Sequence, residues 1–298
     1  MVKELQKTLL SYMQQHQLPE QYLDMVQEYV MQLAGWISQQ KGSTTLVVGI
    51  NGAQGSGKTT LSGVLAIILA QHGYEVAQLS IDDLYLSKVE RLNLATNVHA
   101  LFATRGVPGT HHVQLCLDII QQFKSGIGFV RVPRFDKGID DSVPEAAWYT
   151  YDLPVDIVLL EGWCVGIPPQ QTADLLMPIN ELEAKEDQEG VWRGFVNHAL
   201  THTYQELFQH IDVLVYLQVP SFDSVFLWRQ LQEVKLFRNQ QGHGDCQKAM
   251  TADELQRFIQ HYERLSRWAM QTLPLLADVV IALDDSHHIS KISYKNTE

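Results

Sequence analysis

The sequence contains the stretch Gly52-Ala-Gln-Gly-Ser-Gly-Lys58-Thr59, which has the spacing G-x-x-x-x-G-K-[ST] of a phosphate-binding loop. The apolar run 45–50 precedes it and indicates a strand covered on both faces, and a helical pattern over about 58–72 follows it. Glycine permits backbone conformations in which successive N–H groups point inward, and the start of the helix adds partial positive charge. We therefore expect this loop to hold phosphate groups.

Strands and helices alternate along the rest of the chain. Further strands are predicted at about 75–81, 128–132, 156–160, 212–218 and 278–283, and helices at about 112–124, 191–209, 221–238 and 252–271. This alternation predicts an α/β fold of the P-loop NTPase class, with a mainly parallel sheet flanked by helices.

Three kinds of segment lie outside this alternation. In residues 1–40, apolar residues at three- and four-residue spacings predict two amphipathic helices interrupted by Pro19. We expect an N-terminal helical extension over 1–42, followed by one domain over 43–298. The segments 84–110 and 133–155 are predicted as long loops beyond strand ends, where ligands bind in open α/β sheets. The acidic run 181–189 is predicted as a solvated surface loop.

Composition and charge exclude several classes of protein. The chain has 298 residues, with 22 Lys and Arg against 34 Asp and Glu, so its formal net charge is −12. Its average surface repels nucleic acid, and no apolar run approaches the roughly 20 residues of a membrane-spanning helix. The three cysteines form no C-x-x-C pair, and their odd number leaves one thiol over, which is typical of a reducing compartment. We expect a cytoplasmic protein with neither nucleic acid nor membrane as partner.

Acidic residues follow two of the predicted strands. Asp82 and Asp83 follow the strand 75–81, and Glu161 follows the strand 156–160. Phosphoryl transfer to an alcohol needs a group that accepts the hydroxyl proton, and Asp82 is our candidate. Asp83 either orients that group or assists a metal ion. Glu161 is a candidate Mg²⁺ ligand together with the Thr59 hydroxyl; the alternative for any one of these acids is a helix cap or a turn.

Several stretches together resemble one family. They are the phosphate loop, Ser80-Ile-Asp-Asp-Leu-Tyr-Leu86, Arg105-Gly-Val-Pro-Gly-Thr-His111, Arg131-Val-Pro-Arg-Phe-Asp-Lys137, Leu160-Glu-Gly-Trp163 and Val225-Phe-Leu-Trp-Arg229-Gln-Leu-Gln-Glu233. On these residues the chain resembles the D-glycerate 3-kinase family, which is related to phosphoribulokinase, uridine kinase and pantothenate kinase. The resemblance covers about 44–283.

The resemblance implies an ATP- and Mg²⁺-dependent kinase that phosphorylates a hydroxyl of D-glycerate to give 3-phosphoglycerate. It implies catalytic roles for Lys58, Asp82 and Arg238, with a lid near 229–250. The residues expected to bind the nucleotide are Gly52, Ala53, Gln54, Gly55, Ser56, Gly57, Lys58, Thr59 and Thr60. The expected metal ligands are Thr59, Asp82 and Glu161. The residues expected to bind the acceptor are Asp83, Tyr85, Arg105, His111, Arg134, Asp136 and Lys137.

The residues leave alternatives open for the acceptor. The chain departs from the family pattern at His112, where an Asp is common, and at Ser142, near which an Arg is common. One alternative is a related P-loop kinase acting on pantothenate, a nucleoside or ribulose 5-phosphate. Another is a regulatory protein that binds ATP and transfers nothing.

Overall fold

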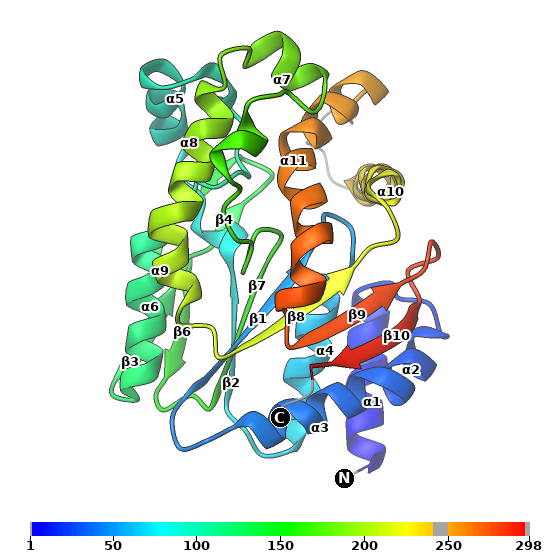
Figure 1. The fold of residues 1–298 in the computed structure, drawn as a ribbon. Helices are drawn as coiled ribbons and strands as arrows, with labels where there is room; N and C mark the ends of the chain where they lie inside the picture. The colour runs from blue at the N-terminus through cyan, green and yellow to red at the C-terminus, as the bar shows by residue number, and fades with distance from the viewer. Residues whose placement is uncertain (1, 241–249, 296–298) are drawn as a thin grey trace.

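The computed structural model describes residues 2–240 and 250–295, and within them six strands form one sheet in the order β10-β9-β8-β1-β7-β2 (Figure 1). All neighbouring strands are parallel except the edge pair β9 and β10, which is antiparallel. The sheet confirms the predicted α/β class. Because the parallel strands share a direction, their carboxyl ends meet at one edge, where ligands bind in such sheets.

The helices of the main fold are α1 (Val2–Gln15), α2 (Tyr22–Met25), a π-helical turn (Val26–Val30), α3 (Met31–Gln40), α4 (Lys58–Gln71), α5 (Lys88–Asn97), α6 (Val113–Ser125), α7 (Glu181–Glu186), α8 (Val191–Ala199), α9 (Gln205–Phe208), α10 (Phe222–Gln240) and α11 (Ala252–Leu276). The strands of the sheet are β1 (Leu46–Gly52), β2 (Val76–Ser80), β7 (Ile157–Gly162), β8 (Val213–Gln218), β9 (Val279–Leu283) and β10 (Ile289–Tyr294).

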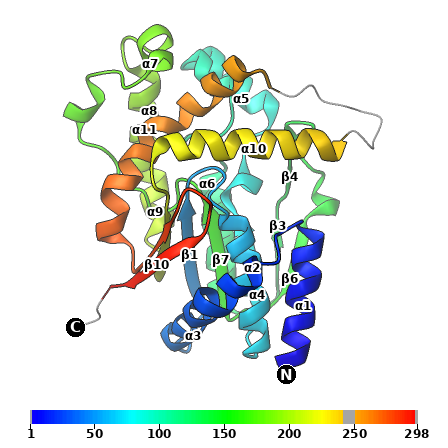
Figure 2. The same ribbon diagram turned by 90° about the vertical axis from the view of Figure 1, so that its right-hand side faces the viewer.

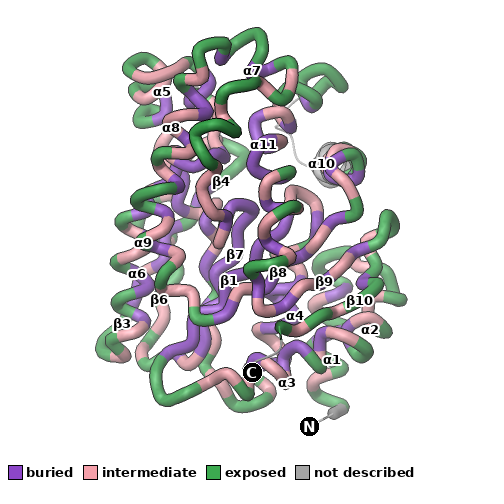
Figure 3. Tube along the Cα trace, in the orientation of Figure 1, coloured by how far each residue is buried: buried purple, intermediate pink, exposed green. Residues whose placement is uncertain are grey.

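Helices cover both faces of the sheet, and the buried residues follow the central strands (Figure 3). On one face α6, α8, α9 and much of α11 enclose one apolar cluster. On the other face the N-terminal helices join α4, and side chains such as Leu9 and Ile37 share a second cluster with Val48 and Leu65. The residues of the N-terminal extension are therefore packed into the core of the sheet domain. Figure 2 shows α10 lying crosswise beyond the carboxyl ends of the strands.

The predicted strand at 128–132 exists but does not join the sheet. It is β3 (Phe129–Val132), which pairs in antiparallel fashion with β6 (Tyr149–Asp152). Phe129 is 61% exposed, whereas Val130 and Val132 are buried. This alternation is typical of a ribbon with one face in water and unlike the continuous burial of a parallel strand.

The segments predicted as long loops contain short elements. Residues 84–110 include α5 and a 3-10 helix (Ala100–Ala103), and residues 133–155 include the small hairpin of β4 (Phe135–Asp136) and β5 (Asp141–Ser142). The edge strand β10 was also not predicted. No helix in the described ranges is both long and apolar enough to cross a membrane.

The prediction of a solvated acidic loop at 181–189 is wrong. Its first half is α7, and Glu183 is fully buried, where it accepts two hydrogen bonds from Arg264 on α11, at 2.8 and 2.6 Å. Asp187 is buried as well and pairs with Arg193. These carboxylates leave water because a guanidinium satisfies each of them.

Arg264→Met should lower the free energy of unfolding by about 3–5 kcal/mol, because it leaves the Glu183 carboxylate buried and unpaired. Arg267→Met removes a pair whose arginine is half exposed and should cost less than about 1 kcal/mol. Urea unfolding followed by circular dichroism measures both. Equal losses in the two variants would contradict this interpretation of α7.

Candidate active site

The phosphate loop follows β1 and leads directly into α4. Gly57 is the residue before α4 and has φ +89°, and Gly55 has φ +81°, conformations that side chains other than glycine rarely adopt. A Cβ on Gly55 would also lie 2.9 Å from Cβ of Trp228. The Ser56 hydroxyl is buried with no hydrogen-bond partner among the described residues. The loop is therefore shaped as the sequence predicts, with an unsatisfied polar group inside it.

One cavity lies where the loop meets the ends of β2 and β7, and we name it the strand-end cavity. It has a volume of about 210 Å³. Its charged lining residues are four cations and two carboxylates: Lys58, Arg105, Lys137, Arg229, Asp82 and Glu161. In a chain of net charge −12, this local excess of cations makes the cavity a site for anions.

Asp82 lies at the centre of a hydrogen-bond network in this cavity. The Tyr85 hydroxyl donates to its Oδ1 at 2.8 Å, and Lys137 Nζ donates to its Oδ2 at 2.7 Å. Burial favours the neutral carboxyl, but the Lys137 and Lys58 ammonium groups outweigh it and hold the pKa of Asp82 well below its usual range. The attraction of Asp82 in turn raises the pKa of Lys137. Asp82 is therefore ionised at neutral pH, and both of its oxygens accept hydrogen bonds.

Thr59 and Glu161 are joined by a hydrogen bond from Thr59 Oγ1 to Glu161 Oε1 of 2.9 Å. The other oxygen, Oε2, is buried without a partner in the described part of the chain. No three His, Cys, Asp or Glu side chains among residues 2–240 and 250–295 gather into a metal-binding cluster. A hydroxyl and one carboxylate with an unsatisfied oxygen fit Mg²⁺, which usually keeps several waters and takes only one or two protein carboxylates.

Arg105 reaches the same cavity from the loop after the 3-10 helix. Its guanidinium pairs with Asp140 and lies 5.6 Å from the ring centroid of Phe135. Its backbone carbonyl accepts a 3.0 Å hydrogen bond from the hydroxyl of Tyr262 on α11. The long helix α11 therefore fixes the backbone that presents this cation.

The structure brings together only some of the residues predicted from the sequence. The predicted residues that line the strand-end cavity are Gln54, Gly55, Lys58, Thr59, Asp82, Tyr85, Arg105, Lys137 and Glu161. Gly52 and Ala53 lie at the start of the loop, where Gly52 ends β1. Arg238 lies on α10, but its side chain is outside the described residues, as are residues 241–249 of the predicted lid.

Four predicted acceptor residues do not line this cavity. The Asp83 carboxylate accepts the Phe135 N–H at 3.0 Å, and the Asp136 carboxylate accepts the Gly138 N–H within its own turn. Arg134 lies over the Tyr149 ring, at 4.6 Å from its centroid. His111 is buried, stacks on Tyr85 and contacts the Tyr204 hydroxyl, and burial lowers its pKa to about 4. His111 is therefore uncharged at neutral pH, and none of these four side chains lines the cavity.

The two departures from the family pattern also lie away from the cavity lining. His112 is the residue before α6 and lies 3.3 Å from the Glu90 carboxylate. Ser142 is exposed on β5, where it pairs with Phe135. Neither side chain is among those that line the strand-end cavity.

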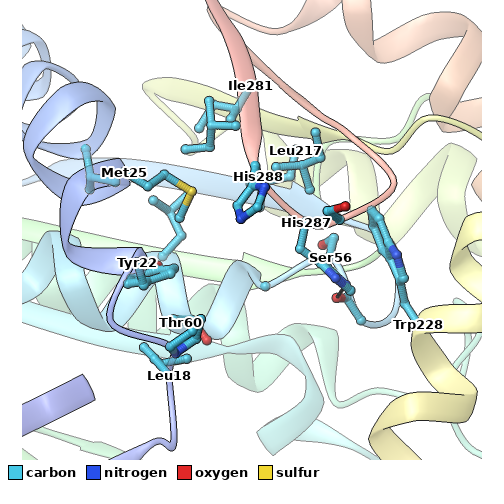
Figure 4. Close-up of a pocket in the computed structure, with 18 of the residues that line it drawn as sticks. Leu18, Tyr22, Met25, Ser56, Thr60, Leu217, Trp228, Ile281, His287 and His288 are labelled. Atoms are coloured by element: carbon cyan, nitrogen blue, oxygen red, sulfur yellow. Dashed lines mark hydrogen bonds between the residues drawn. The ribbon is translucent and has the colours of Figure 1, made fainter. Parts of the chain in front are cut away.

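A second cavity, of about 340 Å³, lies on the other side of the phosphate loop, and we name it the hairpin cavity. Figure 4 shows Leu18, Tyr22 and Met25 of the N-terminal region on one side and Trp228 on the other. His287, from the turn between β9 and β10, lies against Trp228, with ring centroids 3.8 Å apart, and its Nε2 donates to the Gly55 carbonyl at 3.0 Å. Ser56, Gly57 and Thr60 face this cavity, and Gly55 lines both cavities.

Two groups of residues at these cavities were not predicted from the sequence. Phe258 and Tyr262 line the strand-end cavity from α11, yet their spacing is that of any buried helical stripe. Arg229, at the start of the predicted lid, lines the strand-end cavity and lies 5.5 Å from the Phe258 ring centroid. The hairpin cavity joins the N-terminal helices to a turn more than 250 residues later, and no local pattern indicates that contact.

Curated proteins that are similar to this chain in sequence include kinases. The chain is 32% identical over 224 residues to an uncharacterized kinase of Schizosaccharomyces pombe, across 72% of this chain and 78% of that protein. It is 27% identical over 227 residues to the chloroplastic D-glycerate 3-kinase of Arabidopsis thaliana, across 73% of this chain and 46% of that protein, about half its length. No protein-family model matches the chain.

A solved structure shares the fold. The structure of a D-glycerate 3-kinase from Cryptococcus neoformans aligns with a TM-score of 0.72 at 22% identity, covering 90% of this chain and 99% of that one. Three observations agree with one another: the phosphate loop at the end of β1, the parallel sheet, and the extended match to the Schizosaccharomyces pombe kinase. The chain therefore belongs to the D-glycerate 3-kinase-like family and is an ATP-dependent P-loop kinase.

Proposed function

We propose that this kinase transfers the γ-phosphoryl group of Mg·ATP to a hydroxyl of a small acidic metabolite, D-glycerate being the first choice. One observation carries the proposal: the Asp82 carboxylate and the cations Arg105 and Lys137 share a cavity with Lys58 and Thr59 of the phosphate loop. A proton acceptor and a site for a carboxylate thus lie beside the phosphate-binding groups. The relative named D-glycerate 3-kinase adds support.

The size of the strand-end cavity also favours a small acceptor. At about 210 Å³ it is below the roughly 300–1,000 Å³ of sites for drug-sized ligands. Glycerate has one carboxylate and two hydroxyls, and a guanidinium such as Arg105 pairs with a carboxylate in a planar, two-bond geometry. A nucleoside or pantothenate would need more room.

The proposed reaction assigns one task to each group. The acceptor hydroxyl oxygen bonds to the γ-phosphorus as the bond from phosphorus to the bridging oxygen of ADP breaks, and the hydroxyl proton passes to Asp82. Lys58 and Arg229 stabilise the charge on the transferring group. Arg105 and Lys137 orient the acceptor. Thr59 and Glu161 would hold Mg²⁺, which supplies positive charge to the phosphate oxygens when bound.

Glu161→Gln should raise the Mg²⁺ concentration needed for half-maximal activity by about 10-fold, because a neutral amide is a weaker ligand for a hard cation. The measurement is a magnesium titration of initial rates at saturating nucleotide. Glu206→Gln, at an exposed position on α9, serves as the control and should leave the titration unchanged. An unaltered titration for Glu161→Gln would remove Glu161 from the metal site.

We assign the base and ribose of ATP to the hairpin cavity, because this cavity and the strand-end cavity share Gly55 on opposite sides of the phosphate loop. Tyr22→Ala should raise the Kd of a non-hydrolysable ATP analogue by about 10-fold through loss of an aromatic wall, as measured by calorimetry. Tyr29→Ala changes the same helical segment outside the cavity and should leave the Kd unchanged. A Kd that Tyr22→Ala does not alter would count against this assignment.

Turnover with a panel of acceptors tests the proposed function. ADP release from Mg·ATP is measured with D-glycerate, pantothenate, uridine or ribulose 5-phosphate, beside a blank without acceptor. We expect release above the blank with D-glycerate. Release with another acceptor alone would reassign the substrate, and ATP binding without release for any acceptor would favour a regulatory protein.

A further inference from the structure

Arg91 is a fully buried arginine near the strand-end cavity but outside its lining. It lies on α5, and its Nη1 donates to the Leu86 carbonyl at 2.8 Å. Its Nη2 donates to the backbone carbonyl of Asp140 at 3.2 Å and to Asp140 Oδ2 at 2.6 Å. A guanidinium withdrawn from water is tolerated only where it is paired and hydrogen-bonded. Arg91 is therefore committed to Asp140 and is too enclosed to meet a ligand itself.

The Asp140 carboxylate is shared between two arginines. Its Oδ2 accepts from the buried Arg91, and its Oδ1 accepts from Arg105, which lines the cavity. Both guanidinium carbons lie near the Phe135 ring, at 5.8 Å and 5.6 Å from its centroid. The three charged groups and the ring thus form one connected cluster, with only Arg105 open to the cavity.

The charges of this cluster explain why a second arginine is needed. Arg105 and Asp140 alone would form a neutral pair, and a neutral pair attracts an anion weakly. With Arg91 the cluster has two positive charges and one negative charge. Its net charge is therefore +1, and Arg105 presents this charge to the cavity. Because this site is partly shielded from water, one charge more or less changes the affinity for an anion substantially.

We propose that Arg91 is a positioning residue that neutralises Asp140 and so leaves the charge of Arg105 available to the carboxylate of the acceptor. The inference rests on the proposed function, since it requires an anionic acceptor in the strand-end cavity. It assigns to the buried α5 arginine a role in selecting an acid over a neutral molecule of the same shape.

The test compares D-glycerate with D-glyceramide, which has the same skeleton with an uncharged amide. In Arg91→Met we expect the KM for D-glycerate to rise by about 10-fold. The inhibition constant of D-glyceramide, measured against D-glycerate, should stay within about 2-fold, and so should the KM for ATP. In the double variant Arg91→Met/Asp140→Asn both buried charges are removed, and the KM for D-glycerate should return towards that of the wild type. Arg91→Lys keeps the charge and should keep the preference.

A merely structural Arg91 would give a different result. Equal weakening of D-glycerate and D-glyceramide in Arg91→Met, or no recovery in the double variant, would overturn the inference. If Arg91→Met lacks a cooperative unfolding transition, the inference is tested on Asp140→Asn alone, with the same two ligands. Asp140→Asn should prefer D-glycerate over D-glyceramide at least as strongly as the wild type does, and loss of this preference would overturn the inference. A wild-type protein inactive on D-glycerate would instead refute the proposed function, and the inference with it.

Discussion

Asp82→Asn should lower kcat by about 10²–10⁴-fold, the contribution typical of a positioned general base. Asparagine has nearly the shape of aspartate but cannot take up the acceptor proton. The asparagine oxygen can still accept the hydrogen bond from the Tyr85 hydroxyl, which in the wild type is donated to Asp82 at 2.8 Å. We therefore expect the Kd of a non-hydrolysable ATP analogue to remain within a few-fold of the wild type. The measurement is single-turnover kinetics with D-glycerate beside calorimetry of the analogue.

Asp83→Asn is the matched control for this prediction. Asp83 is the next residue along the chain, but its carboxylate accepts the Phe135 N–H and does not line the strand-end cavity. Burial raises its pKa, which the Phe135 hydrogen bond opposes. The asparagine can still accept that hydrogen bond, so kcat should fall far less than in Asp82→Asn. Near-normal turnover in Asp82→Asn would refute the role of Asp82 as base.

Lys58→Met should lower kcat by about 10²–10³-fold, because it removes a fixed positive charge from the oxygens on which negative charge develops. Methionine keeps most of the length and apolar volume of the lysine stem. The loss should exceed any rise in the KM for ATP, since the charge is needed most in the transition state. Initial-rate kinetics at varied ATP and saturating acceptor separate the two effects.

Lys185→Met provides the comparison, because Lys185 is exposed on α7 and pairs with Glu181 one turn away. It changes the net charge of the protein by the same amount and should leave kcat unaltered. If Lys58→Met raised the KM for ATP while kcat stayed normal, Lys58 would contribute to binding alone.

The features that could be predicted from the sequence are those that a short stretch of residues indicates by itself. The loop from Gly52 to Thr59 has its own spacing, and strands such as β7 are continuous apolar runs, so the sheet and the phosphate loop that follows β1 were predictable. Asp82 and Glu161 follow from the rule that strand ends meet at one edge. The structure then adds the hydrogen bond from Thr59 to Glu161.

Features that depend on distant contacts were not predictable in this way. The burial of Glu183 requires Arg264, which lies 81 positions later, and a run of acids by itself indicates a solvated surface. Likewise β3 has the composition of a sheet strand, but it pairs with β6 outside the six-stranded sheet and leaves Phe129 exposed. His111 lies in a matching stretch, yet Tyr85 and Tyr204 enclose it. In each case a residue distant in the sequence determines whether the side chain is buried or exposed, and a single sequence does not identify that residue.

Direct detection of the product tests the central claim most strictly. Phosphorus NMR of a reaction containing Mg·ATP, D-glycerate and the wild-type protein should show ADP and 3-phosphoglycerate forming in equal amounts, and neither should accumulate with Asp82→Asn. Binding of the ATP analogue, measured in parallel, verifies that the protein is competent. ATP that is bound but left intact, or ADP formed without any phosphoglycerate, would contradict phosphoryl transfer to D-glycerate.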